Sequence, residues 1–196
     1  MKLLVISNPN AVIGEAAIIN GLFAAGLSCF HLRKPGYSAT QLSGLLNLIH
    51  HRYHPCIALH QHHEIAEEFG ITRLHYTEQA YAKTKPTLLK SQNEEGLTLS
   101  TSSHKMDMLT SLKGFAYVFY GPVFNSLSKP GYLSKLDPGF RLPPRSGAPE
   151  VVALGGIKLG NLSRIKEMNF DGAAVLGAIW NKPEQAIEKF KQLNYD

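Results

Sequence analysis

The sequence predicts an α/β protein folded as a single compact (β/α)8 TIM barrel, and two observations support this. The first is a set of eight short β-rich runs that are apolar on both faces, as expected of parallel strands covered by helices. The second is the helical character of the segments between them. A doubly wound open sheet shares this alternation, and strand counting alone does not exclude it. The expected strands cover residues 2–7, 28–32, 56–60, 72–76, 97–101, 115–120, 150–154 and 172–176.

Six segments between these strands have helical patterns. Residues 14–25 are rich in Ala and Ile and end at Gly26, a residue suited to the position after a helix. Residues 38–51 place four aliphatic side chains on one face. Pro183 stands in the first turn of the last helix, where proline is tolerated. The expected helices cover residues 14–25, 38–51, 63–69, 104–112, 160–168 and 183–193.

Composition and length indicate one soluble domain covering residues 1–196. The chain is long enough to bury one core, and its 44% hydrophobic and 18% charged residues are ordinary for a globular protein. No apolar run approaches the length of a membrane span, and the first seven residues resemble a strand more than a signal peptide. Cys29 and Cys56 each lie inside an apolar run, which suggests buried thiols in a reducing compartment. We therefore expect a cytoplasmic protein.

The charge distribution favours a small anionic ligand. The net charge is +5, and the loop 121–148 contains four cations against one carboxylate, Asp137. A local excess of cations can steer anions to one rim of a site. Nucleic acid is not expected as a partner, because this Pro/Gly-rich loop has no recognition helix and no interleaved aromatic residues. The four cations are Lys129, Lys135, Arg141 and Arg145.

Three strand ends have the residues of a phosphate site, and barrel chemistry takes place at the carboxyl ends of the strands. The apolar run 115–120 stops at a Gly-Pro pair and is followed by two hydroxyls and a lysine, Ser126, Ser128 and Lys129. Gly155-Gly156 and Leu176-Gly177 follow the seventh and eighth strands, where backbone N–H groups can approach a phosphate. One such pair would simply make a tight turn; two at these strands favour phosphate binding.

Five motifs together resemble the thiamine phosphate synthase/TenI family, and the match runs nearly from end to end. Residues 121–129 (G-P-V-F-N-S-L-S-K) are similar to the family's G-P-V-F-x-T-x-T-K, and residues 152–157 (V-A-L-G-G-I) to its V-A-I-G-G-I. Residues 172–179 echo G-V-A-V-V-S-A-I, and residues 100–104 keep the serine and histidine of G-x-S-x-H. Residues 31–35 (H-L-R-K-P) correspond to the strand-two motif Q-L-R-x-K.

This resemblance implies a (β/α)8 barrel of thiamine biosynthesis with one of two activities. Synthases of the family join a pyrimidine methyl diphosphate to a thiazole phosphate, with Mg²⁺ on the diphosphate. The TenI branch includes a metal-independent tautomerase that aromatises a thiazole carboxylate phosphate. The resemblance implies that Arg33 and Lys129 face the pyrimidine-side diphosphate. The residues implied around the thiazole phosphate are Ser126, Ser128, Gly156 and Gly177.

The departures from the family pattern affect the magnesium half of the site. The family's strand-three N-D reads H-Q at residues 60–61, and its second magnesium aspartate falls at Ala80. Glu78 is the only carboxylate close by in the sequence. The strand-two lysine is displaced to Lys34, because Pro35 occupies its position. Mg²⁺ prefers carboxylates and phosphate oxygens. The pattern therefore favours a TenI-like protein without a cofactor, and Mg²⁺ is expected only if the chain is a working synthase.

Four histidines fall at the expected carboxyl ends of strands two to five: His31, His60, His75 and His104. Four imidazoles around one mouth could bind a transition metal or serve acid–base chemistry. Residues 60–64 (H-Q-H-H-E) lack zinc-helix spacing, and closely spaced histidines usually titrate separately in solvent, so no metal ligands are expected. Tautomerisation needs a group that removes and returns a proton, and His104 at the S-x-H position suits this task. Its alternative role is to cap a helix.

The sequence thus predicts catalytic residues and a set of substrate-binding residues. The expected catalytic residues are His104, Lys129 and Arg33. The expected phosphate- or substrate-binding residues are Ser102, Ser126, Ser128, Gly155, Gly156, Leu176, Gly177, His31, His60 and His75.

The favoured hypothesis is a TenI-like enzyme that binds a small phosphorylated thiazole or pyrimidine, with no nucleic-acid or membrane partner. Three alternatives remain: a working synthase in which Glu78 or a histidine replaces the missing ligands, a non-catalytic regulator that binds a phosphorylated ligand, and a metal-dependent hydrolase that uses the histidines. A homo-oligomer is left open.

Overall fold

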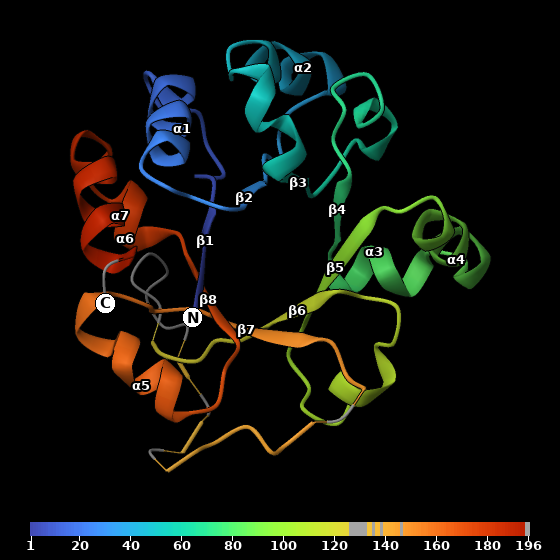
Figure 1. Cartoon of the computed structure of the whole chain (residues 1–196), viewed down its shortest axis with the longest axis vertical. Coiled ribbons are helices and arrows are strands. Elements are labelled where there is room, and N and C mark those ends of the chain that lie inside the picture. Colours follow the sequence, from blue (N-terminus) through green and yellow to red (C-terminus); the bar gives the residue numbers. More distant parts are fainter. Residues whose placement is uncertain (126–132, 135, 138, 146, 195–196) are drawn as a thin grey trace.

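Eight parallel strands form a closed barrel in the computed structural model, which describes residues 1–125, 133–134, 136–137, 139–145 and 147–194 (Figure 1). Each strand pairs with the next along the chain, and β8 pairs with β1 to close the barrel. All eight expected strands are confirmed, and closure excludes the open sheet. The strands are β1 (Lys2–Ile6), β2 (Phe30–Leu32), β3 (Ile57–Leu59), β4 (Arg73–Tyr76), β5 (Thr98–Ser103), β6 (Tyr117–Tyr120), β7 (Glu150–Leu154) and β8 (Gly172–Val175).

Helices surround the barrel in Figure 1. The α-helices are α1 (Glu15–Ala24), α2 (Ala39–Asn47), α3 (Glu78–Lys83), α4 (Pro86–Glu94), α5 (Leu162–Glu167), α6 (Gly177–Trp180) and α7 (Ala186–Asn194). Short 3-10 turns complete the set: η1 (His51–Cys56), η2 (His63–Ile65), η3 (Leu109–Ser111), η4 (Leu159–Asn161) and η5 (Pro183–Gln185). None of the described helices has the length and apolar character that a membrane span requires.

Two expected helices are wrong, and three observed ones, α3, α4 and the short α6, lie outside the expected ranges. Residues 63–69 and 104–112 form only the single turns η2 and η3, because segments of seven and nine residues are too short to repay helix nucleation by themselves. Between β4 and β5 the chain forms α3 and α4 instead. The N-cap signal for α3 is Thr77, whose hydroxyl accepts from the Ala80 amide, and α4 has Pro86 in its first turn.

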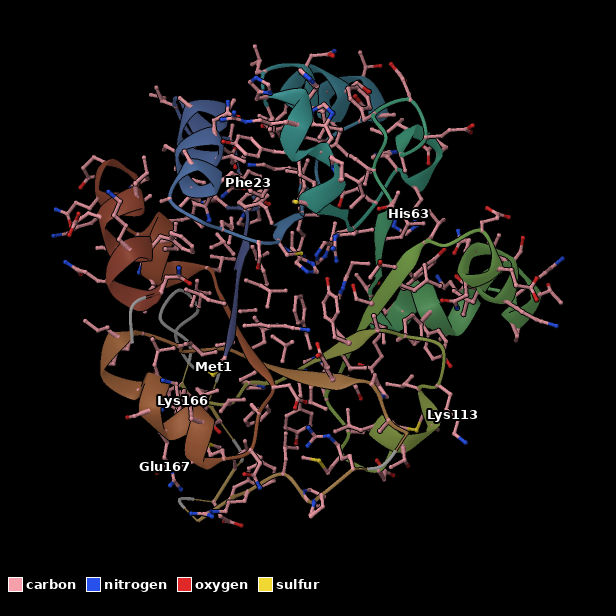
Figure 2. The ribbon with its side chains drawn as sticks, viewed as in Figure 1. Met1, Phe23, His63, Lys113, Lys166 and Glu167 are labelled. Atoms are coloured by element: carbon pink, nitrogen blue, oxygen red, sulfur yellow. The ribbon has the colours of Figure 1, made fainter. Side chains whose placement is uncertain are left out.

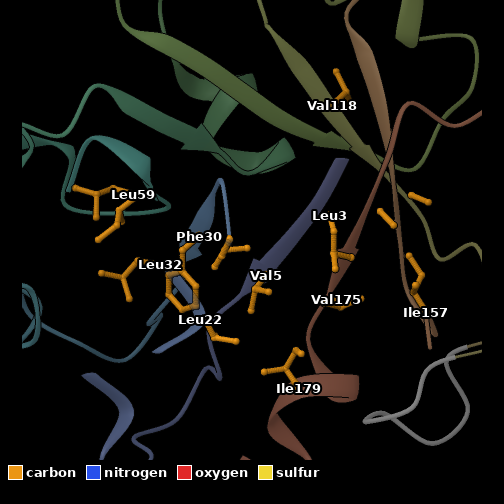
Figure 3. Packing of buried hydrophobic residues seen from close by; sticks show 14 of the residues in the cluster. Leu3, Val5, Leu22, Phe30, Leu32, Leu59, Val118, Ile157, Val175 and Ile179 are labelled. Atoms are coloured by element: carbon orange, nitrogen blue, oxygen red, sulfur yellow. The ribbon is translucent and has the colours of Figure 1, made fainter. Parts of the chain in front are cut away.

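Successive strand residues alternate between the barrel interior and the helix layer. Outward-facing residues such as Leu3, Val5 and Val175 pack with helix residues such as Leu22 in the main core (Figure 3). Inward-facing residues form a second, smaller apolar cluster: Leu4, Ile6, Cys29, Ala58, Tyr117, Phe119, Val152 and Ala174. Because side chains alternate along a strand, residues two positions further along point to the same interior. That phase brings His31, His60 and His75 inside.

A buried ion pair connects the end of β2 to α1. Lys34 Nζ donates to Glu15 Oε2 at 2.6 Å and to the Asn10 carbonyl at 2.7 Å. The Lys34 side chain is fully buried and Glu15 is 4% exposed. The lysine displaced from the family's strand-two motif therefore holds the β1–α1 connection in place and does not reach the mouth.

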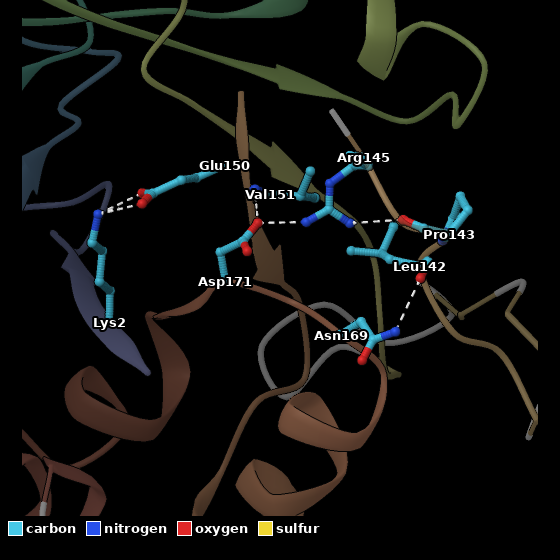
Figure 4. A network of polar contacts seen from close by, with 8 residues as sticks. All are labelled: Lys2, Leu142, Pro143, Arg145, Glu150, Val151, Asn169 and Asp171. Carbon is cyan, nitrogen blue, oxygen red and sulfur yellow. Dashed lines mark hydrogen bonds and ion pairs between the residues drawn. The ribbon is translucent and has the colours of Figure 1, made fainter. Parts of the chain in front are cut away.

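A polar network ties the long β6–β7 connection to the amino-terminal ends of the strands (Figure 4). Arg145 Nη2 contacts Asp171 Oδ2 at 2.6 Å, and the same oxygen accepts from the Val151 amide at 2.7 Å. Lys2 and Glu150 pair beside it at 2.6 Å. Asp171 precedes β8, so Arg145 lies at the end of the barrel opposite the mouth. The expectation that the four cations of this connection share one rim is wrong for Arg145.

Candidate active site at the barrel mouth

His104 follows β5 directly and lies exposed at the carboxyl end of the barrel. Its Nδ1 is hydrogen-bonded to the Gly121 carbonyl oxygen, just after β6. A carbonyl only accepts, so Nδ1 bears the hydrogen and, in the neutral ring, Nε2 keeps its lone pair. His104 is therefore held in the tautomer of a base at Nε2. The expected role of helix cap does not apply, since no helix begins at this residue.

Gly121 is required by close packing as well as by this hydrogen bond. A Cβ built on Gly121 would lie 2.1 Å from the Leu154 carbonyl oxygen, which no side chain tolerates. The next residues stay against the end of β7, because the Val123 amide donates to Leu154 O at 2.9 Å and the Phe124 amide to Gly155 O at 3.1 Å. The G-P-V-F motif thus positions the acceptor that orients His104.

The glycine pair after β7 also has a packing role. Gly155 and Gly156 have φ values of 101° and 66°, in the left-handed region that favours glycine. A Cβ on Gly156 would lie 2.2 Å from the Asn125 carbonyl oxygen, and one on Gly155 would lie 2.9 Å from Pro122 Cα. Tight packing accounts for both glycines, so their phosphate-binding role stays a prediction. The eighth-strand turn is similar: Leu176 is half-buried and Gly177, buried, begins α6.

Beside the Gly155-Gly156 turn lies a cavity of about 490 Å³, lined on one side by residues 123–125, 134, 136 and 137 and on the other by residues after β7. Its polar lining includes Asn125, Ser134, Asp137, Lys158 and Asn161. Ser126, Ser128 and Lys129 lie outside the described residues, so the roles expected of them stay predictions.

Arg33 follows β2 at the same end of the barrel. The Ser7 hydroxyl accepts from the Arg33 amide at 2.8 Å and donates to the Arg33 carbonyl at 2.9 Å, which pins this residue to the end of β1. The half-buried Arg33 guanidinium lies close enough to contribute to the lowered pKa values of His60 and His75. The structure therefore places Arg33 beside the interior histidines, as a mouth residue, despite the altered strand-two motif.

Below the mouth, three expected substrate-binding histidines meet in the barrel interior. His31 Nδ1 and His60 Nε2 are 2.9 Å apart, and the rings of His60 and His75 stack with centroids 4.0 Å apart. Exposure of the three side chains is 0%, 9% and 1%, in the order His31, His60, His75. The expectation that closely spaced histidines titrate separately in solvent is wrong for His60. His104 does not join this group.

Hydroxyl groups surround the three rings. Tyr117 Oη lies 2.8 Å from His31 Nε2, and His75 contacts Ser100 Oγ at 2.9 Å through Nδ1 and Ser102 Oγ at 3.0 Å through Nε2. Ser102, which was expected to bind substrate, is thus already hydrogen-bonded to His75. The sequence reasoning did not identify Tyr117 and Ser100. Both lie on strand positions in phase with inward-facing residues, and that alternation is the signal that could have found them.

The interior histidines are neutral near pH 7. Burial, together with smaller contributions from nearby His63 and Arg33, lowers the pKa of His75 to about 3. Burial, followed by the neighbouring His75, holds the pKa values of His31 and His60 well below their ordinary range. Burial likewise raises the pKa of Tyr117 well above its usual value, so the phenol stays protonated.

His63 lies outside the group although it is close in sequence. Its Nε2 contacts the Leu59 carbonyl at 3.0 Å, and its ring packs edge-on against Tyr76, with centroids 4.8 Å apart. Figure 2 shows it beside β4.

The family's magnesium positions do not fit that ion here. Gln61 presents a buried amide nitrogen that has no partner among the described residues, Ala80 has no ligand atom, and Glu78 is exposed in the first turn of α3. Within the part of the chain that the structure describes, the one convergent group of three or more His, Cys, Asp or Glu residues contains histidines alone. Mg²⁺ prefers oxygen ligands. At the family's two magnesium positions, the described residues therefore do not supply the carboxylate oxygens that this ion prefers.

The protein is a (β/α)8 TIM barrel, and its polar groups converge at the carboxyl ends of the strands, where the active sites of TIM-barrel enzymes lie. Residues 3–179 match the family model described as thiamine monophosphate synthase (TMP-TENI), and the chain belongs to this family. It is 24% identical over 174 residues to a thiamine-phosphate synthase of Leuconostoc citreum, covering 83% of this chain and 79% of that one.

Solved structures agree with this assignment. The crystal structure of a thiamine phosphate pyrophosphorylase from Bacteroides thetaiotaomicron is 30% identical, with a TM-score of 0.76 over 99% of this chain and 96% of that one. A thiamine phosphate pyrophosphorylase from Pyrococcus furiosus is 16% identical, with a TM-score of 0.71 over 99% of this chain and 94% of that one, and supports the fold alone. The chain therefore belongs to a family of thiamine-biosynthesis enzymes.

Proposed function

We propose that the protein is a TenI-like enzyme that moves a proton within a phosphorylated thiazole, with His104 as the acid and base. The observation that supports this best is the hydrogen bond from His104 to the Gly121 carbonyl, which orients an exposed imidazole and leaves Nε2 as the basic atom. The two positions at which the family has magnesium-binding carboxylates are Gln61 and Ala80 here, which also favours a metal-independent reaction.

The proposed step conserves atoms. His104 Nε2 takes a proton from a ring carbon, the electrons of that C–H bond enter the conjugated system, and the imidazolium returns a proton to a conjugated carbon outside the ring, which leaves the ring aromatic. Substrate and product are then isomers, and no co-reactant is consumed. The Gly121 carbonyl oxygen keeps the His104 imidazole in place, because it accepts a hydrogen bond from Nδ1–H in both protonation states of the histidine.

Charged and polar groups at the barrel mouth are suited to an anionic substrate. Arg33 supplies a fixed cation at the mouth, and Ser102 is a half-buried hydroxyl two residues before His104. In this proposal Arg33 binds the substrate carboxylate or phosphate, and the turns at Gly156 and Gly177 present backbone N–H groups to the phosphate. Lys129 adds a second cation, as the family motif implies.

The test is an isomerisation assay on a thiazole carboxylate phosphate, compared between the wild type, His104→Ala and the exposed-histidine control His51→Ala. We expect His104→Ala to lose roughly 10²–10⁴-fold in kcat, the usual contribution of a general acid–base group, with the control unchanged. Addition of EDTA should leave the rate unchanged. Equal rates in His104→Ala and wild type would contradict the role of His104.

A working synthase is the second candidate, because the relatives of 24% and 30% identity carry synthase and pyrophosphorylase names. The same preparations can decide between the two. Release of diphosphate from a pyrimidine methyl diphosphate and a thiazole phosphate under Mg²⁺, abolished by Lys129→Ala, would establish the synthase and overturn the tautomerase proposal.

A further inference from the structure

We propose that His31, His60 and His75 form a binding site for one divalent transition-metal ion of the zinc class, inside the barrel and below the mouth. Their candidate ligand atoms lie within 4.8 Å of one another, on three adjacent strand ends. The site uses residues that the proposed proton transfer does not need. The inference therefore stands independently of the proposed function.

The chemistry of the three side chains selects the metal. A metal binds the lone pair of a neutral imidazole, and all three buried rings are neutral near pH 7 because burial opposes their protonation. Imidazole nitrogen suits Zn²⁺, Cu²⁺, Ni²⁺ and Co²⁺, whereas Mg²⁺ requires oxygen. Three histidines with an open fourth position are a known arrangement for zinc. This site therefore differs from a magnesium site in both ligands and location.

The separations between the candidate ligand nitrogens range from slightly shorter to longer than those around a tetrahedral ion. Zn–N bonds of 2.0–2.1 Å separate ligand nitrogens by roughly 3.3 Å. His31 Nδ1 and His60 Nε2 are 2.9 Å apart, so a bound ion would replace their hydrogen bond by moving the atoms slightly apart. All of the candidate ligand atoms are within 4.8 Å, so closing the set needs side-chain rotation but no movement of the strands.

Outer partners already orient two of the rings. Metal-bound histidine usually donates its second ring N–H to an oxygen. Tyr117 Oη stands at 2.8 Å from His31 Nε2, and the hydroxyls of Ser100 and Ser102 flank His75. With Nε2–H of His31 directed at Tyr117, Nδ1 is left as its ligand atom. His75 can likewise keep one serine as partner and offer its other nitrogen.

His60 has an unused ring nitrogen. Its Nδ1 is buried and has no hydrogen-bond partner among the described residues. The residue is only 9% exposed. Buried polar atoms are normally paired, and an orphan needs an explanation. A hydrogen-bonded network of the apo rings alone leaves this atom unpaired. An ion that draws His60 away from His31 gives its ring freedom to turn, so that either nitrogen can serve as a ligand.

The charges near the site indicate what would complete it. Arg33 and Arg73 are the cations whose fields reach these histidines, and no carboxylate joins the group among the described residues. The ion would therefore keep its positive charge and take water or an anionic group in its fourth position, reached from the Ser102 side. Ser102 is half-buried, and Phe119, its register partner on β6, packs its ring against His31 and His75.

Metal content and a cobalt spectrum test the proposal on the full chain. Protein stripped with EDTA is loaded with CoCl2 or ZnCl2 alone, desalted and measured by elemental analysis. We expect one equivalent in the wild type and in the control His51→Asn, and a loss of at least tenfold in affinity in His60→Asn and His75→Gln. Bound Co²⁺ should show visible absorption bands of a tetrahedral or five-coordinate nitrogen site. Absence of both retained metal and these bands in the wild type overturns the proposal.

Thermal stability supplies the second measurement and guards against misfolded variants. Zinc that binds only the folded state at 100-fold above its Kd should raise the Tm of the wild type by roughly 5–10 °C. The same addition should leave His60→Asn unshifted while its circular dichroism spectrum matches the wild type. An equal Tm shift in His60→Asn would place the metal elsewhere and overturn the assignment. Unchanged tautomerase activity with zinc bound would leave this proposal intact, so the two proposals can fail separately.

Discussion

The two halves of the barrel mouth are built differently. The half formed by β6 and β7 has glycines packed against neighbouring backbone: a Cβ on Gly121 or Gly156 would lie 2.1–2.2 Å from a carbonyl oxygen. The half formed by β2 to β5 is lined by imidazoles that contact one another and hydroxyl groups. Backbone packing leaves the first half little freedom to change, whereas side chains inside the second half can be exchanged within the same frame. The family motifs are retained in the first half and altered in the second.

The largest effect on stability is expected at the Lys34–Glu15 ion pair, which supports the β2–β5 half of the mouth (the imidazole half). Lys34→Met leaves the buried Glu15 carboxylate without its partner and should destabilise the protein by about 3–5 kcal/mol. The double variant Lys34→Met/Glu15→Leu should recover most of this, because burial already opposes both charges: it raises the pKa of Glu15 and lowers that of Lys34. Urea unfolding measures both. A double variant no more stable than Lys34→Met would contradict the argument.

The close backbone packing of the β6–β7 half of the mouth can be tested at Gly156. Gly156→Ala places a Cβ against Asn125 O and Phe124 at a φ of 66°, so we expect a loss of about 2–4 kcal/mol. Gly160→Ala is the matched control, because a Cβ there meets no atom within 4 Å and the φ is not positive. The control should change stability by less than about 0.5 kcal/mol. Similar thermal unfolding of both variants would show that the turn relaxes freely.

A smaller effect is expected in the pH dependence of folding stability, which the buried histidines of the imidazole half cause. In the chelator-treated protein, the lowered pKa values mean that the unfolded chain binds more protons than the folded one below about pH 6.5. Stability is therefore complete above that value and falls as the pH drops towards 3, by up to about 1.4 kcal/mol per pH unit for each histidine. Denaturant unfolding between pH 7.5 and 4.5 measures the slope. His75→Gln should reduce it, whereas His51→Asn should leave it unchanged; equal slopes in all three proteins would refute the assignment.

The sequence predicted the barrel more completely than the site. Eight strands and the residues at their carboxyl ends follow from short apolar runs and glycine turns, which are local signals. The helices after β3 and β5 were predicted wrongly, because a polar segment of seven to nine residues has no reliable local signal between helix and single turn. The orientation of His104 by Gly121 depends on two residues seventeen positions apart and has no local signal.

By itself, the sequence determined which residues stand at the strand ends and where glycines mark the turns that follow, because apolar runs and glycine positions are local signals. Only the tertiary structure decided that His31, His60 and His75 meet in the interior while His104 stays at the surface. Closure of the barrel and the register of β2, β3 and β4 bring together residues 15–44 positions apart, and side-chain alternation directs them inward. Burial then removes their charge, and three histidines expected to bind substrate become a proposed metal site.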